Sequence, residues 1–122
     1  MIAGLINWKP TMSTPEPPIR VVLTTTADPE EAARLGRIFV AERLAACVTL
    51  LPAVQSIYRW KGEVESATET LLLIKTATDQ LAALEARLQE LHSYDTPEFV
   101  VLAIDAVSQP YLDWLQASLR NP

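Results

Sequence analysis

Residues 46–75 decide the fold, and they read ACVTLLPAVQSIYRW, then KG, then EVESATETLLLIK. The first run is rich in apolar and β-branched residues and resumes after Pro52, which predicts a long strand with a bulge or an edge position at the proline. The pair at 61–62 suits a tight turn, and the chain returns as a second strand that reaches Lys75. Such a hairpin is too long for a domain of this size. We therefore expect it to overhang the sheet and to offer exposed edges to another chain.

A strand and a helix are predicted before the hairpin. Residues 19–25 (IRVVLTT) are apolar and β-branched, as in a buried strand. Asp28 suits the cap of a helix and Pro29 its first position, and Glu31 completes a capping box. Apolar residues then recur at helical spacing, so we expect this helix to end at about Leu44.

After the hairpin the same alternation is repeated. A leucine stripe that begins after residues 78–79 predicts a second helix with His92 at its end. Residues 99–104 (FVVLAI) predict a buried strand, and residues 108–110 (SQP) begin a short C-terminal helix. The order β-α-β-β-α-β plus a terminal helix predicts an α+β, ferredoxin-like fold, with an antiparallel sheet and both main helices on one face.

The domain boundaries and the second face of the sheet follow from this order. Four prolines crowd residues 1–18, which we interpret as a flexible N-terminal tail, and residues 19–122 form the domain. Strand side chains alternate between the two faces of a sheet, so the face opposite the helices also carries apolar residues that need cover. A homo-oligomer would supply that cover, although this argument does not choose between a dimer and a trimer.

The composition excludes several classes of protein. The chain has 122 residues, of which 49% are hydrophobic and 20% charged, which fits one domain with a core. A net charge of −5 argues against nucleic-acid binding, and no apolar run reaches the roughly 18 residues that span a membrane. The single cysteine fits a reducing compartment, and we expect the cytoplasm. One cysteine and one histidine cannot form a usual zinc site within one chain unless carboxylates help.

Several co-linear blocks resemble the CutA divalent-cation-tolerance family, and together they span roughly residues 19 to 120. The blocks are 42–48 (ERLAACV), 56–62 (SIYRWKG), 73–76 (LIKT), 90–98 (ELHSYDTPE) and 111–114 (YLDW). The resemblance implies a ferredoxin-like homotrimer whose long hairpins reach neighbouring subunits, a role in tolerance to copper and other divalent cations, and an architecture similar to the PII signalling trimers. The sequence departs from the family pattern in two places. Thr49 replaces a usual Asn, and residues 92–95 read HSYD where the family usually reads HPYE, so the loss of the proline predicts a looser backbone after His92.

His92, Glu98 and Cys47 are the candidate metal ligands. Imidazole and carboxylate suit a mixed site for copper, and a thiol suits copper(I). A helix end is an exposed place for His92, and the alternative is a surface histidine that interacts with the helix C-terminus. Cys47 is equally typical of a small buried apolar residue. Glu98 and the neighbouring Asp95 are equally typical of a solvated acidic loop.

Trp60, Tyr58, Tyr94 and Lys75 are the candidate residues of a ligand cleft between subunits. The aromatic side chains could also serve only to pack the hairpin and an interface. An ammonium inside an apolar strand needs a partner, so we expect Lys75 to pair with a carboxylate such as Glu98 or to reach the cleft.

Three functions remain open at this point. The first is a metal-binding trimer, with a divalent ion such as copper as its ligand. The second is a PII-like signalling or scaffold trimer that binds a small ligand or a protein at its clefts. The third is a structural trimer without a ligand. GxSxG, P-loop, GxGxxG and HExxH motifs are absent from the sequence, so we do not expect an enzyme.

Overall fold

A computed structural model describes residues 17–120 of the chain. The predicted tail therefore lies outside the described residues, except for its last two prolines. The elements follow in the order β1 (Ile19–Thr26), α2 (Pro29–Ala41), β2 (Cys47–Trp60), β3 (Glu63–Ala77), a short 3-10 turn (Thr78–Gln80), α3 (Leu81–Leu91), β4 (Val100–Ala103) and α4 (Gln109–Leu119). This order confirms the predicted α+β, ferredoxin-like fold.

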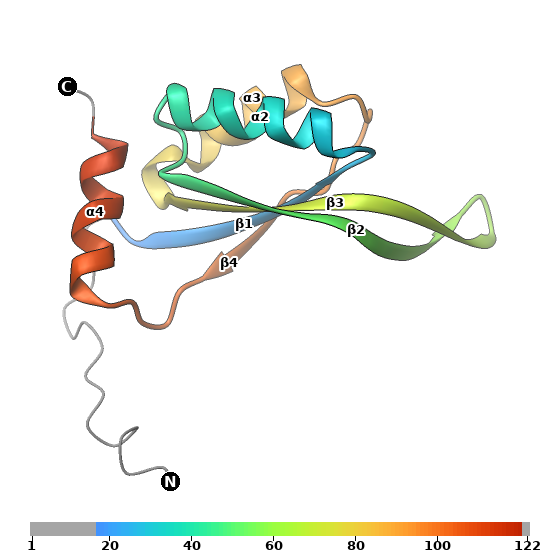
Figure 1. The fold of residues 1–122 in the computed structure, drawn as a ribbon. Coiled ribbons are helices and arrows are strands. Elements are labelled where there is room, and N and C mark those ends of the chain that lie inside the picture. Colours follow the sequence, from blue (N-terminus) through green and yellow to red (C-terminus); the bar gives the residue numbers. More distant parts are fainter. Residues whose placement is uncertain (1–16, 121–122) are drawn as a thin grey trace, which may run out of the picture.

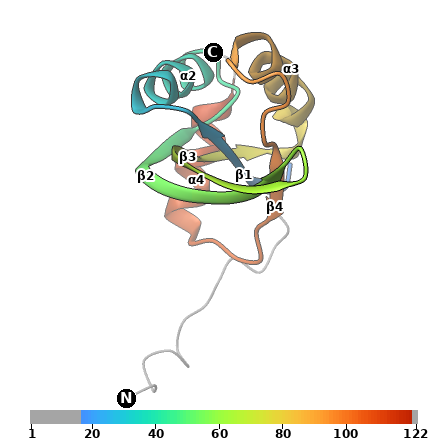
Figure 2. The same cartoon turned by 90° about the vertical axis from the view of Figure 1, so that its right-hand side faces the viewer.

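The sheet has four antiparallel strands in the order β2-β3-β1-β4. Helices α2 and α3 lie side by side on one face of it, and α4 lies across one end (Figures 1 and 2). No helix of the described residues covers the centre of the opposite face (Figure 1). The two edges of the sheet are the long strand β2 and the short strand β4.

The hairpin of β2 and β3 projects beyond the two-layered body, as the sequence predicted (Figure 1). The register of the pair shifts between Leu51 and Val54, so the bulge expected at the proline is present. Ala53 has a φ of 60° at this point. The turn at the tip uses left-handed backbone at both Lys61 (φ 50°) and Gly62 (φ 83°), a conformation typical of two-residue hairpin loops.

Helix α2 begins as predicted and ends earlier. The Asp28 carboxylate accepts a hydrogen bond of 2.8 Å from the Glu31 amide and so caps the helix. The helix ends at Ala41 rather than near Leu44, because the chain turns through left-handed backbone at Arg43 (φ 59°). Leu44 remains part of the core, although it lies in the loop after the helix.

The core lies between the sheet and α2 with α3. A second, smaller cluster joins α4 to the end of the sheet. The main cluster consists of Val22, Ala32, Leu35, Phe39, Leu44, Ala45, Leu72, Ile74, Leu84 and Leu88. The cluster under α4 consists of Ile19, Ala46, Ala77, Leu112 and Leu115.

The face of the sheet opposite α2 and α3 carries cross-strand rows that are mostly apolar and are half-buried or exposed. Residues that pair directly across antiparallel strands share a face, so the register defines these rows. They are Val21–Lys75–Cys47, Leu23–Leu73–Thr49 and Thr25–Leu71–Leu51. The second apolar face that the sequence predicted is therefore present.

Candidate functional site

A groove of about 730 Å³ lies between the overhanging hairpin and the loop that connects α3 to β4. The hairpin forms one wall because it is longer than the rest of the sheet, so its strands pass beside the loop after they leave the body (Figure 1). The loop forms the other wall. The lining residues are Thr25, Ser56, Ile57, Tyr58, Trp60, Ala67, Glu69, Tyr94, Asp95, Thr96 and Glu98. A volume of this size is within the range of small-molecule sites.

The lining of the groove combines carboxylates with aromatic rings. Its three charged side chains are Glu69, Asp95 and Glu98, and the described residues contribute no lysine or arginine to it. Carboxylates gathered in a concave site create a negative potential that attracts cations. Tyr58, Trp60 and Tyr94 supply aromatic rings, so three of the four predicted cleft residues meet in this groove.

Tyr94 anchors the loop wall to the hairpin wall. Its phenol donates a hydrogen bond of 2.7 Å to the Glu69 carboxylate. Burial raises the pKa of the Tyr94 phenol well above its ordinary value, and the hydrogen bond and negative charge of Glu69 raise it further. The phenol therefore stays protonated as a donor, and one oxygen of Glu69 is held in place.

His92 lies behind the groove and not on the surface. The residue is only 8% exposed, so the expectation of an exposed histidine at the helix end is wrong. Its Nδ1 accepts a hydrogen bond of 2.9 Å from the Tyr94 amide, and its Nε2 lies 2.7 Å from the Thr25 carbonyl oxygen. A carbonyl only accepts, so Nε2 carries the proton and the ring is the neutral Nε2–H tautomer. Neither ring nitrogen has a lone pair free for a metal ion in this arrangement.

The buried carboxylate of Glu31 holds the start of the same loop. It accepts hydrogen bonds of 2.9 Å from both the amide and the hydroxyl of Ser93. The Glu31 side chain is therefore used here, rather than in the capping box predicted for α2. One of its oxygens also lies 3.8 Å from Nδ1 of His92.

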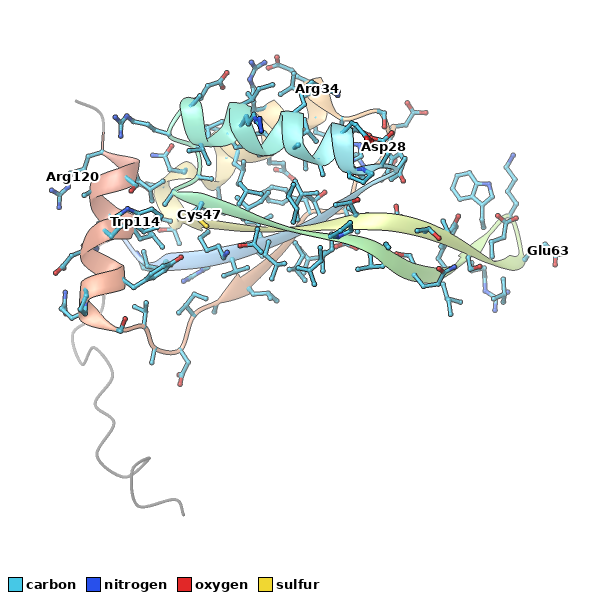
Figure 3. The ribbon with its side chains drawn as sticks, in the orientation of Figure 1. Asp28, Arg34, Cys47, Glu63, Trp114 and Arg120 are labelled. Carbon is cyan, nitrogen blue, oxygen red and sulfur yellow. The ribbon has the colours of Figure 1, made fainter. Side chains whose placement is uncertain are left out.

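Cys47 and Lys75 form a separate cluster near α4. The Lys75 ammonium lies 3.6 Å from the Cys47 sulfur and donates a hydrogen bond to the Thr49 hydroxyl. Burial raises the pKa of the Tyr111 phenol on α4, and the neighbouring Cys47 raises it further. Figure 3 shows Cys47 at this end of the sheet, close to α4. The expected pairing of Lys75 with Glu98 is therefore wrong, and neither Cys47 nor Lys75 lines the groove.

The structure thus divides the predicted site residues into three places. Glu98 lines the groove, His92 is buried behind it, and Cys47 lies elsewhere on the sheet. Within residues 17–120, no group of three or more His, Cys, Asp or Glu side chains lies close enough together to hold a metal ion. Glu69 was not among the predicted site residues. It lies two residues before Leu71 on the same strand, so strand alternation places it on the same face of the sheet as that leucine.

These features define a class of protein, namely a small ferredoxin-like domain with an overhanging hairpin and an acidic, aromatic groove beside it. The CutA1 divalent ion tolerance protein family matches residues 20–118. The chain belongs to this family, as the sequence blocks predicted.

Relatives and solved structures agree with this assignment. The divalent-cation tolerance protein CutA of Pectobacterium atrosepticum is 46% identical over 100 residues, which is 82% of this chain and 91% of the relative. A chloroplastic CutA protein of Arabidopsis thaliana is 41% identical over 104 residues, or 85% of this chain and 57% of the relative. The solved structure of a divalent cation tolerance protein (Cut A1) from Thermus thermophilus has a TM-score of 0.77 and 46% identity, and the match covers 80% of this chain and 94% of that chain.

The helices of the described part give one further finding. None of the helices within residues 17–120 is long and apolar enough to cross a membrane.

Proposed function

We propose that this chain acts in divalent-cation tolerance as a non-enzymatic homotrimer of the cytoplasm, and that its acidic groove is a cation site at the boundary between subunits. The observation that carries the proposal is the lining of the groove, where Glu69, Asp95 and Glu98 are the charged side chains and the described residues contribute no basic side chain. Copper(II) is the first cation to test, because it binds nitrogen and oxygen ligands most strongly among the divalent ions of its series.

The trimer is supported by apolar surface that a single chain leaves in water. Val64 on the hairpin is 68% exposed, and Val100 and Leu102 on β4 are 45% and 43% exposed. The free sheet face adds half-buried rows of leucine and valine. Exposed apolar surface of this extent is typical of protein interfaces, and packing between copies of the chain would remove it from water.

The ligand count also favours a site shared between subunits. Copper needs more ligands than the described part of one chain gathers, and the ring nitrogens of His92 are already used. A second subunit that packs against the groove would add donors to Glu98. Cys47 remains a candidate ligand for a soft ion at its own place on the sheet, apart from the groove.

The aromatic lining supports a second candidate function. Tyr58, Trp60 and Tyr94 offer more aromatic surface than a metal site requires. A PII-like trimer that binds a small organic ligand or a protein partner in the same groove would use that surface.

The proposal is tested by measuring the mass in solution by ultracentrifugation and by titrating the protein with copper(II) in a calorimeter. The variant is Glu98→Gln, and the matched control is Glu85→Gln, an exposed carboxylate on α3 that does not line the groove. The proposal expects a trimer and saturable binding that Glu98→Gln weakens and Glu85→Gln leaves unchanged. A monomer would refute the trimer, and equal affinity in both variants would refute the groove as the copper site.

A further inference from the structure

The groove has two properties that a bare metal ion does not use. Its carboxylates are spread along the walls, and aromatic rings lie among them. We propose that the groove binds a linear organic polyamine, whose ammonium groups pair with the separate carboxylates while its methylene chain lies against the rings. This inference rests on the proposed function only in taking the groove as a cation site.

The positions of the carboxylates favour an extended cation. Glu69 lies on β3 in the hairpin wall, whereas Asp95 and Glu98 lie in the loop wall. They are not close enough together to surround one ion, since the described residues contain no such group. A polyamine carries its charges at intervals along a chain, so it can meet carboxylates on both walls at once. The phenol of Tyr94 holds the Glu69 carboxylate in position for such a contact.

The aromatic rings supply the second part of the recognition. An ammonium group near the face of a tryptophan or tyrosine is attracted by the negative face of the ring. Trp60 already makes this contact within its own chain, because the Lys61 ammonium lies 5.9 Å from the centre of the Trp60 ring. The ring is thus placed to accept an ammonium group, and Lys61 would compete with a polyamine for it.

Because Lys61 competes for the ring, substitutions at Lys61 and at Trp60 should change the polyamine affinity in opposite directions. Lys61→Gln removes the positive charge that lies over the Trp60 ring, so it should free the ring and tighten polyamine binding. Trp60→Ala removes the ring and should weaken it. An exposed cation–π contact corresponds to a change of about two- to fivefold in affinity in each direction.

The experiment is calorimetric titration of the full chain with spermidine at low ionic strength, with copper(II) titrated in parallel. Glu98→Gln should weaken spermidine binding by about two- to tenfold, as expected for the loss of one charge-assisted contact. The control is Glu63→Gln, because Glu63 lies at the hairpin tip outside the groove lining (Figure 3) and changes the net charge equally. Spermidine affinity in this control should equal that of the unchanged chain.

The results separate this inference from the proposed function. Spermidine binding that weakens in Glu98→Gln and Trp60→Ala, and tightens in Lys61→Gln, supports the polyamine site whether or not copper binds. Saturable copper binding that depends on Glu98, without spermidine binding, overturns the inference and leaves the proposed metal function standing. Spermidine binding that is absent, or equal in every variant including Glu63→Gln, also overturns it. The mass in solution tests the trimer independently.

Discussion

Valine substitutions at Thr24 and Thr76 should change the stability of this protein in opposite directions. Both threonines are fully buried on strands of the sheet. The Thr76 hydroxyl donates a hydrogen bond of 2.7 Å to the Leu44 carbonyl oxygen. The Thr24 hydroxyl is the one buried side-chain polar atom within residues 17–120 that has no hydrogen-bond partner. Valine has nearly the shape of threonine, so each substitution changes the polarity of the site and little of its packing.

The magnitudes follow from the cost of an unpaired polar group. Thr76→Val leaves the Leu44 carbonyl without its side-chain donor inside the protein, which costs about 1–3 kcal/mol. Thr24→Val removes a hydroxyl that already lacks a partner, so it should raise the free energy of unfolding by about 1 kcal/mol. The register pairs Thr24 with Leu72 and Thr76 with Arg20, so the two sites lie four residues apart along the strands. We therefore expect the effects to add in the double variant.

Urea unfolding followed by circular dichroism measures the free energy in the two variants and in the double variant. Every chain is measured at the same subunit concentration, because the stability of an oligomer depends on concentration. The midpoint for Thr24→Val should lie above that of the unchanged chain, and the midpoint for Thr76→Val below it. If Thr24→Val destabilises the protein as much as Thr76→Val does, the Thr24 hydroxyl must have a partner, and the prediction is refuted.

Three further predictions concern the groove and its surroundings. His92→Ala should destabilise the protein by about 2–4 kcal/mol even with a chelator present, because its two hydrogen bonds are structural; a loss of stability seen only without the chelator would assign it to metal binding. Alkaline titration of tyrosine absorbance should show Tyr94 ionising far above the ordinary range, and Glu69→Gln should lower its pKa; an unchanged titration curve would contradict the hydrogen bond. Val64→Ser should weaken the proposed trimer by about 1–3 kcal/mol, because Val64 is an exposed apolar side chain of the hairpin that does not line the groove, and ultracentrifugation at decreasing concentration would detect the change; an unchanged association constant would show that this part of the hairpin is no interface.

The sequence predicted the fold because its strongest signals are local. The alternation of residues 46–75, the turn at 61–62 and the cap at Asp28 each define an element without reference to the rest of the chain. The predicted end of α2, at about Leu44, lies beyond the observed end at Ala41. Helical spacing of apolar residues continues to Leu44, whereas the backbone turns away at Arg43. Leu44 is buried for a tertiary reason, since the core needs it, and such a residue resembles a helical one in the pattern.

The site was less predictable because its contacts join distant segments. A histidine at a helix end is typical of the surface, and the sequence does not show that Thr25 and Tyr94 enclose His92 from opposite sides. In the same way, the pairing of Lys75 with Cys47 depends on the register of β2 and β3, which the sequence sets only approximately. The aromatic residues of the hairpin do reach the groove, because the length of the hairpin carries them past the body of the domain.

Ser93 shows how a departure from the family pattern is accommodated. A proline at this position would have no amide proton, so it could not donate to Glu31. Serine donates twice, through its amide and its hydroxyl, and both bonds end on the buried Glu31 carboxylate. The loop is thus held by polar contacts where the sequence suggested a looser backbone. Because Tyr94, Asp95 and Glu98 follow directly, the Glu31–Ser93 contact fixes the start of the groove wall, and the chemistry of the groove depends on a residue that does not line it.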